Sequence, residues 1–322
     1  MYPHIPVLLN EVLEYLEPGR GGAYLDGTVG LGGHSEAILN AGPSGLSGSS
    51  GKIRLIGLDK DTRALETARK RLAPFNESVH LENTAFSNFA TVLEKFAPDG
   101  IDGALLDLGV SSIQLDSPER GFSFMHDGPL DMRMGAEGEL AKSTESALEL
   151  IESTSFEELR RIIAEYGEEP MAAPIARAII AARNEGIEST LQLAKIVEQA
   201  YPPKWRAKAR HHPATRTFQA LRMAVNQELD ELKTFLELIP SWLKPGGRLV
   251  IISFHSLEDR MVKQAFRDGS ATCVCPKSLP QCICEIKPVY RVITKRPVTP
   301  GDEELSFNPR AGSSKLRAAE RI

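Results

Sequence analysis

Short apolar runs alternate with segments of helical periodicity along the first third of the chain. The runs cover residues 23–25, 53–58, 79–81 and 101–106. The segments between them, such as residues 61–72, place apolar side chains three and four positions apart. Strands that alternate with helices form parallel sheets through crossover connections, so the pattern predicts an α/β fold.

The pattern changes after residue 115, where helical signals replace strands up to residue 212. Ser155 and Glu158 form a capping box ahead of apolar positions spaced three and four apart, and Gly167 follows as a stop signal. We interpret residues 116–212 as an inserted helical domain. Residues 1–115 and 213–322 then form the sheet domain that surrounds it.

The last part of the chain has the signals needed to complete the sheet domain. Residues 218–239 have the periodicity of one long amphipathic helix. Residues 244–247, Lys-Pro-Gly-Gly, predict a turn before an apolar strand at 249–252. Residues 289–294 and 315–322 are candidates for the strands that close the sheet.

A glycine-rich turn follows the first predicted strand. It reads Asp-Gly-Thr-Val-Gly-Leu-Gly-Gly-His from Asp26 to His34 and leads into a helix. Glycines let the backbone approach a ligand, and Asp59, at the end of the second strand, can accept ribose hydroxyls. This order predicts a nucleoside-containing ligand, either a dinucleotide or S-adenosylmethionine. The turn at 244–247 resembles a feature of S-adenosylmethionine enzymes and favours methyl transfer.

Composition narrows the class of protein further. The chain has 322 residues, 42% of them hydrophobic and 25% charged, which is ordinary for a folded globular protein. No apolar run is long enough for a membrane helix, and the first residues lack the basic segment of a signal peptide. Four cysteines are too few for a disulfide scaffold. We therefore expect a soluble protein of the cytoplasm with no membrane partner.

The formal net charge is −5, but basic side chains gather in one stretch. Residues 199–227 include six basic side chains and no acidic one, with Trp205 and Phe218 among them. Such a stretch suits phosphate contacts and base stacking, although a solvated face is the alternative. We expect it to contact RNA, mainly through Lys204, Arg206, Lys208, Arg210 and Arg216.

The four cysteines form two pairs with a single residue inside each pair, Cys273 with Cys275 and Cys282 with Cys284. Structural zinc sites usually have two or more residues between paired ligands. Two interpretations stay open: a four-thiolate zinc site, and reduced thiols in a loop.

Eight motifs point to one family. They resemble the bacterial rRNA small-subunit methyltransferase H family, also called MraW, and they span nearly the whole chain. The resemblance implies a class I S-adenosylmethionine-dependent methyltransferase, with a Rossmann-like sheet and an inserted helical domain. The motifs are His4-x-Pro-Val-Leu-Leu-x-Glu11, Asp26-Gly-Thr-x-Gly-x-Gly-Gly-His-Ser35, Leu106-Asp-Leu-Gly-Val-Ser-Ser-x-Gln-Leu-Asp116, Glu119-Arg-Gly-Phe-Ser-Phe124, Asp127-Gly-Pro-Leu-Asp-Met-Arg133, His212-Pro-Ala-Thr-Arg-Thr-Phe-Gln-Ala-Leu-Arg222, Ser253-Phe-His-Ser-Leu-Glu-Asp-Arg260 and Asn308-Pro-Arg-Ala311.

The resemblance also implies a reaction. Members of the family methylate the exocyclic N4 of a cytidine in the decoding centre of 16S rRNA, with S-adenosyl-L-methionine as methyl donor. The expected partner is 16S rRNA or the small ribosomal subunit, and a homodimer stays open. By resemblance, the cofactor contacts fall on Gly32, Gly33, His34, Asp59, Phe86, Asp107 and Gln114.

Methyl transfer to an amine needs orientation and an acceptor for the amine N–H. We expect activity to depend most on Asp107, at the end of the fourth strand, which either holds the methionine ammonium or faces the target amine. Ser111 and Ser112 are secondary candidates for holding the base. Many amino-methyltransferases have a Pro-Pro-aromatic sequence at this position. This chain lacks it, so their mechanism does not transfer.

The pattern leaves other functions open. A methyltransferase of the same fold can act on protein or DNA, an oxidoreductase can use the glycine turn, and a non-catalytic module can bind RNA alone. The turn at 244–247 argues against the oxidoreductase. A paired cytosine must be flipped out to react. Phe122, Phe124 and Met125 either wall a pocket for it or pack the inserted domain.

Overall fold

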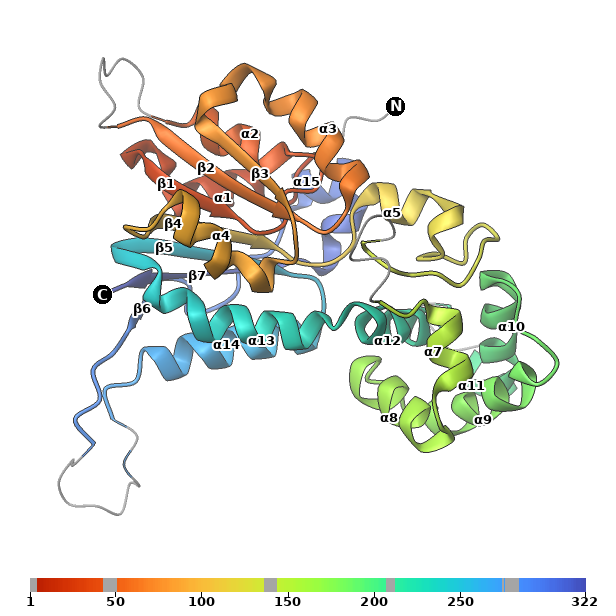
Figure 1. Ribbon diagram of the computed structural model, residues 1–322. Helices are drawn as coiled ribbons and strands as arrows, with labels where there is room; N and C mark the ends of the chain where they lie inside the picture. The colour runs from red at the N-terminus through yellow and green to blue at the C-terminus, as the bar shows by residue number, and fades with distance from the viewer. Residues whose placement is uncertain (1–4, 43–50, 136–143, 207–211, 274, 276–283) are drawn as a thin grey trace. The chain divides into compact units, whose positions relative to one another are not determined.

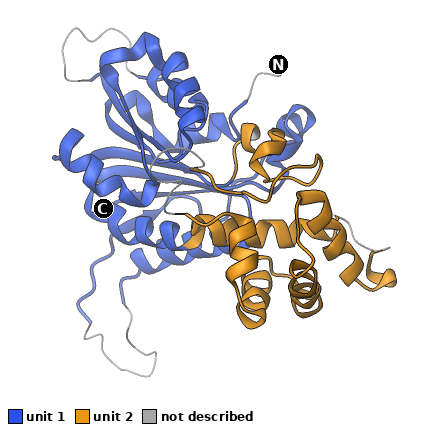
Figure 2. Ribbon diagram, turned by 45° about the vertical axis from the view of Figure 1, so that its right-hand side comes forward, with its two compact units in different colours: residues 1–109, 230–322 blue, residues 110–229 orange. Residues whose placement is uncertain are grey.

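The chain divides into two compact units. The computed structural model describes residues 5–42, 51–135, 144–206, 212–273, 275 and 284–322. Unit 1 contains residues 1–109 and 230–322, and unit 2 contains residues 110–229 (Figure 2). These boundaries differ from the expected ones at 115/116 and 212/213. The reason is that α12 (Ala214–Asn226) buries Phe218 and Leu221 in the core of unit 2.

Unit 1 is built on a seven-stranded sheet with the strand order β3-β2-β1-β4-β5-β7-β6 (Figure 1). The strand β7 is antiparallel to β5 and β6, and the other neighbours are parallel. This is the arrangement of class I methyltransferases, so the predicted fold class is confirmed. The strands are β1 (Gly22–Asp26), β2 (Ile53–Asp59), β3 (Val79–Asn83), β4 (Ile101–Asp107), β5 (Leu243–Ser253), β6 (Tyr290–Val292) and β7 (Lys315–Arg321).

Helices cover both faces of this sheet. Successive side chains of a strand point to opposite faces, so Leu25 and Leu106 pack with α4, α13 and α14, whereas Tyr24 and Leu105 pack with α1 and α2. Burial on both faces explains why the central strands are continuous apolar runs. The helices are α1 (Leu9–Leu16), α2 (Gly33–Asn40), α3 (Thr62–Leu72), α4 (Phe89–Phe96), α13 (Glu228–Leu238), α14 (Ser256–Gly269) and α15 (Asp302–Phe307).

The helix predicted over 218–239 is wrong in one respect, because the structure has two helices there. Gln227 has a φ of 52°, a left-handed conformation that ends α12 before α13 begins. Arg222 spans the break through two hydrogen bonds of 2.8 Å to the carboxylate of Glu228. Hydrophobic periodicity continues through this position and does not report the backbone conformation of one residue.

The turn expected at 244–247 lies inside β5 instead of before it. Ile101 pairs with Leu243 and Gly103 pairs with Arg248, so the four intervening residues bulge out opposite Asp102. The glycines of this segment permit the bulge, since Gly246 has a φ of 81°. The two closing strands are confirmed as β6 and β7.

The described part of unit 2 consists of helices and their connections. Ser155 caps α8 by accepting the Glu158 N–H at 3.2 Å, but the Glu158 side chain pairs with Arg161, so only half of the predicted capping box forms. None of the described helices in the chain is both long and apolar enough to cross a membrane. The helices of unit 2 are α5 (Ser112–Asp116), α7 (Ala147–Ser153), α8 (Phe156–Tyr166), α9 (Ala172–Arg183), α10 (Thr190–Ala200), α11 (Pro203–Arg206) and α12.

Of the three residues proposed to line a base pocket, Phe122 and Phe124 are packed against other side chains and Met125 is exposed. Phe122 is buried in the core of unit 2, and the Phe124 ring packs edge-on against Phe218, with centroids 4.8 Å apart. Met125 is 77% exposed. The packing interpretation therefore accounts for both phenylalanines.

Candidate cofactor site

The glycine-rich turn between β1 and α2 requires its glycines. Gly32 has a φ of 79° and is the N-cap of α2. A Cβ at Gly33 would lie 2.5 Å from Pro6 Cγ, and a Cβ at Gly27 would lie 2.4 Å from Leu106 Cδ2. Side chains at these positions would push the turn away from the sheet. The turn is thus held as bare backbone at the carboxyl ends of the strands, where parallel sheets bind ligands.

Hydrogen bonds tie this turn to the ends of β1 and β4. The buried carboxylate of Asp26 accepts the Thr28 N–H at 3.1 Å and the Ser35 hydroxyl at 2.6 Å. Thr28 Oγ1 in turn accepts the backbone N–H of Asp107 at 2.6 Å. Burial raises the pKa of Asp26, and the Ser35 hydrogen bond opposes that rise. The turn, the start of α2 and the backbone of Asp107 are therefore one connected unit.

Asp59 connects the end of β2 to the same turn. Its two carboxylate oxygens accept the Gly30 N–H at 2.7 Å and the Asp61 N–H at 2.8 Å. Burial raises the pKa of Asp59 to about 6, although both N–H groups favour the charged form. Each oxygen has a second lone pair, so the carboxylate can still accept hydroxyl groups such as those of a ribose.

His34 and Asp107 lie close together, but several of their buried polar atoms form no hydrogen bond within the described structure. His34 is 6% exposed, and its Nε2 lies 3.5 Å from Asp107 Oδ2. Within the described structure, neither ring nitrogen of His34 nor Asp107 Oδ1 has a hydrogen-bond partner. Burying such groups without partners costs free energy, so this pair indicates a place for a polar ligand.

Phe86, which the family resemblance implies as a cofactor contact, lies beside the turn. It begins the short helix η3 (Phe86–Asn88) after β3, and its Cβ would lie 3.2 Å from a Cβ at Gly27. Its ring packs edge-on against Phe235, with centroids 5.9 Å apart. This half-buried ring borders the glycine turn and also belongs to the core.

These residues fit a nucleoside-containing cofactor that carries a cationic group. The glycines let the turn pack tightly at the strand ends, Asp59 offers acceptors for hydroxyls, and Asp107 has a buried oxygen with no hydrogen-bond partner in the described protein. In unit 1 the structure thus brings together the predicted residues Gly32, Gly33, His34, Asp59, Phe86 and Asp107. Their contact with a cofactor stays a prediction.

Three positioning residues were missed by sequence reasoning. Asp26, Thr28 and Ser35 hold the turn and the Asp107 backbone in place. The sequence could have drawn attention to these residues, because all three lie in the motif that begins at Asp26. A sequence motif shows that polar residues gather, but it does not show which of them bond to each other.

In unit 2, Gln114 and Ser111 hold the start of a helix. Gln114 is 4% exposed, and its side-chain Oε1 accepts the Ser111 N–H at 3.0 Å. The backbone N–H of Gln114 donates to Ser111 Oγ, and the two hydrogen bonds together form the capping box of α5. The side chain of Ser112 lies outside what the structure describes. The proposed roles of all three residues in binding stay predictions.

The basic stretch is only partly within the described residues. Lys204 and Arg206 lie on α11 on either side of Trp205, which is 54% exposed. Arg216 donates to the Glu168 carbonyl at 3.0 Å, so part of its guanidinium is used within unit 2. Lys208 and Arg210 lie outside the described residues.

Arg222 also belongs to this stretch, and the expectation of no nearby acidic partner is wrong for it. Its guanidinium pairs with the carboxylate of Glu228, one residue beyond the stretch. The pairing depends on the helix break at Gln227, which the sequence pattern did not show.

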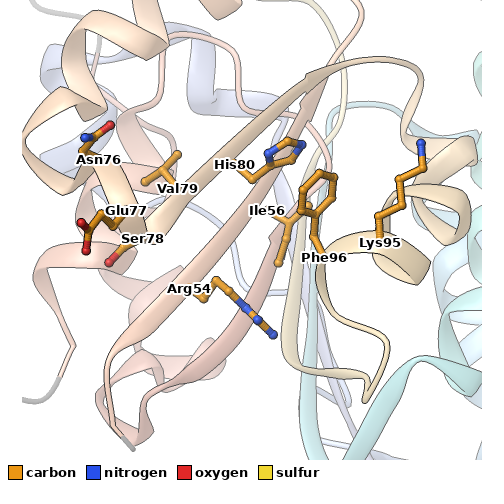
Figure 3. A pocket seen from close by; sticks show the side chains of 9 residues that line it. All are labelled: Arg54, Ile56, Asn76, Glu77, Ser78, Val79, His80, Lys95 and Phe96. Carbon is orange, nitrogen blue, oxygen red and sulfur yellow. The ribbon is translucent and has the colours of Figure 1, made fainter. Parts of the chain in front are cut away.

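A pocket of about 440 Å³ lies at the other end of unit 1 (Figure 3). It is at the amino ends of β2 and β3, where the His80 ring stacks on Phe96 with centroids 3.5 Å apart. Its lining lacks the glycine turn and the strand-end carboxylates. The lining residues are Arg54, Ile56, Asn76, Glu77, Ser78, Val79, His80, Lys95 and Phe96.

Comparisons with known proteins found a matching family and several similar proteins. The model of the MraW methylase family matches residues 1–322. The ribosomal RNA small subunit methyltransferase H of Oleidesulfovibrio alaskensis is 57% identical over 99% of this chain and 95% of its own, and that of Lawsonia intracellularis is 49% identical over 99% of each. A solved rRNA methylase from Streptococcus thermophilus is 11% identical, with a TM-score of 0.41 over 98% of this chain and 93% of that chain.

Proposed function

This chain belongs to the MraW methylase family, and on that premise we propose that it transfers a methyl group from S-adenosyl-L-methionine to the exocyclic N4 of a cytidine in 16S rRNA. The observation that carries the proposal is the pair of His34 and Asp107. Its buried polar atoms, which have no hydrogen-bond partner in the described protein, lie at the carboxyl end of β4 next to the glycine turn.

The residues of unit 1 would hold the cofactor and orient the reacting groups. S-adenosylmethionine, when bound, supplies a methyl group activated by its sulfonium charge. Asp59 would accept the ribose hydroxyls, and the tight turn that Gly32 and Gly33 permit would hold the rest of the molecule at the strand ends. Phe86 would lie against the adenine.

Asp107 would act at the target amine or at the methionine ammonium. The lone pair of a cytosine amine is delocalised into the ring, and an acceptor on its N–H localises that pair. Asp107 Oδ1 is an acceptor of this kind, and Thr28 fixes its backbone while His34 lies against its other oxygen. Orientation of this kind supplies much of the rate enhancement in group transfer.

Unit 2 would contact the RNA. Lys204 and Arg206 offer charges for phosphates, and the exposed Trp205 ring between them offers a stacking surface. Ribosomal RNA is made and assembled in the bacterial cytoplasm, where we place the reaction. We propose the small ribosomal subunit or its 16S rRNA as acceptor. Gel filtration would measure whether a homodimer forms.

The test is methyl transfer from labelled S-adenosylmethionine to small subunits that lack the modification, with the product nucleoside identified by mass spectrometry. The expected product is N4-methylcytidine at one position. A different methylated nucleoside would overturn the assigned target atom, and transfer to protein or DNA alone would overturn the RNA acceptor. Failure to bind the cofactor would overturn the site itself.

A further inference from the structure

Three cysteines gather in unit 1, far along the chain from the glycine turn. Cys273, Cys275 and Cys284 have their sulfur atoms within 4.8 Å of one another. Cys273 is exposed, and the other two are partly buried. We propose that these three thiols bind one zinc ion, which cross-links the segment between α14 and β6.

The geometry is close to what a zinc ion requires. Thiolates bind tetrahedral zinc at about 2.3 Å, which places their sulfur atoms about 3.8 Å apart. The three described sulfur atoms already lie within 4.8 Å of one another, so small side-chain rotations close the set. Each ligand would release its thiol proton on binding, because the thiolate is the form that coordinates.

A backbone N–H also points at one of the three sulfur atoms. The N–H of Cys275 donates to Cys273 Sγ at 3.4 Å. Donors aimed at a sulfur atom stabilise its negative charge, and this helps to gather several thiolates at one ion. Thiolate ligands select soft or borderline ions, and zinc is the one that forms tetrahedral sites without redox chemistry.

The surrounding chain gives such a site a structural role. The segment is closed at its base, where the Val289 N–H donates to the Gly269 carbonyl at 2.6 Å and the Tyr290 ring packs on Phe266, with centroids 5.6 Å apart. Figure 1 shows the described flanks leaving the sheet between α14 and β6. Zinc at Cys273, Cys275 and Cys284 would join the two flanks.

The fourth cysteine, Cys282, lies outside the described residues, and the proposal does not depend on it. A Cys282→Ser variant distinguishes two forms of the site. Loss of zinc would add Cys282 as fourth ligand, and retention would leave the three described cysteines as the protein ligands. Either result supports zinc at this cluster.

Elemental analysis of the full chain, purified in reductant without a metal-affinity step, tests the proposal. We expect one zinc per chain, lost in Cys273→Ser and Cys284→Ser and kept in the neighbouring exposed control Thr272→Ala. Cobalt-substituted protein should show thiolate-to-metal charge-transfer absorption. Proteolysis between α14 and β6 should become about tenfold faster in the two cysteine variants, because local opening would no longer be opposed by the ion.

A second measurement covers variants that fold poorly. Titration of the wild-type thiols with a mercurial should release one zinc per chain as the cysteines of the cluster are modified. Metal-free protein with fully reactive thiols, a disulfide among these cysteines, or bound iron or copper in place of zinc would each overturn the proposal. Zinc that persists unchanged in both cysteine variants would do the same. None of these results affects the proposed methyl transfer.

Discussion

Two pairs of polar side chains with buried atoms, one pair in each unit, bond in different ways. In unit 1, His34 and Asp107 lie 3.5 Å apart with buried atoms that have no partner, next to backbone kept bare by glycines. In unit 2, the side chains of Asn226 and Gln114 form hydrogen bonds with backbone groups of the same unit. The first pattern suits a ligand and the second suits structure. Substitution of Asp107 should therefore affect binding and catalysis, and substitution of Asn226 should affect folding.

The strongest test of this contrast is Asp107→Asn, which removes the charge and keeps the size. We expect methyl transfer to fall by about a thousandfold, as when a charge-stabilising group is removed from an active site. The unfolding midpoint should hardly change, since Asp107 Oδ1 bonds to nothing in the described protein. Single-turnover assays and thermal unfolding measure both. The exposed Asp99→Asn is the matched control, and activity within tenfold of wild type for Asp107→Asn would contradict the assignment.

The opposite behaviour is expected for Asn226→Ala in unit 2. Asn226 is 4% exposed, accepts the Met134 N–H at 2.8 Å and donates to the Met132 and Arg222 carbonyls at 2.8 Å each. Removing it leaves buried backbone groups unsatisfied, which should cost about 2–3 kcal/mol of stability. Hydrogen exchange of the α12 amides should detect this, while cofactor affinity stays unchanged. Exposed Asn184→Ala should cost less than about 1 kcal/mol.

The affinity for the cofactor should depend on pH through the protonation of Asp59 in unit 1. Its pKa of about 6 means that a large part of the carboxyl is protonated at pH 6 and loses acceptor capacity. The dissociation constant should be flat above about pH 7 and rise about tenfold per pH unit below 6, as one-proton linkage requires. Calorimetry across this range measures it, and Asp59→Asn should flatten the profile.

Protonation of Asp59 should weaken cofactor binding but stabilise the folded protein. Because its folded-state pKa lies above the ordinary value of 3.8, this carboxyl favours folding at acid pH, and that contribution is lost as pH rises to about 6. Weaker cofactor binding at acid pH therefore cannot come from acid unfolding through Asp59. A profile without a break near pH 6 would remove Asp59 from the site.

Sequence reasoning succeeded where the information is local. The glycine turn, the strand ahead of it and the aspartate at the end of β2 follow from apolar runs and from residues that punctuate them. Their meeting at one sheet edge follows because parallel strands present their carboxyl ends together. The closing strands β6 and β7 were also candidates from the sequence, whereas the strand order was not predicted.

Sequence reasoning failed where one residue's backbone conformation or a long-range bond decides the outcome. The break at Gln227 depends on a single positive φ, and the bulge at 244–247 depends on the register with β4. The pairing of Thr28 with the Asp107 N–H joins residues that are 79 positions apart. Periodicity reports which face of an element is buried, and it carries no information about such bonds.

The RNA-binding role of unit 2 predicts a smaller effect that leaves unit 1 unchanged. The double variant Lys204→Glu and Arg206→Glu should weaken rRNA binding about three- to tenfold and lower its salt slope by about two. Cofactor affinity should not change. Lys263→Glu with Arg267→Glu, on the exposed side of α14, gives the same charge change in unit 1. If both double variants lower the salt slope equally, net charge and not this stretch governs binding.

The smallest effect tests whether the turn positions Asp107. Thr28→Val keeps the shape of the side chain but removes the acceptor of the Asp107 N–H, which should cost about 1 kcal/mol of stability. If the bond places the carboxylate, methyl transfer should fall several-fold at saturating cofactor while the dissociation constant of the cofactor changes little. Thr28→Ser restores the hydroxyl and should restore the rate, which a role in packing alone would not predict. A loss of rate in Thr28→Ser without a loss in Thr28→Val would mean that the methyl group of Thr28, and not its hydroxyl, matters to the site. In that case the connection between the glycine turn and β4 is one of packing, and the contrast between the two units narrows to His34 and Asp107.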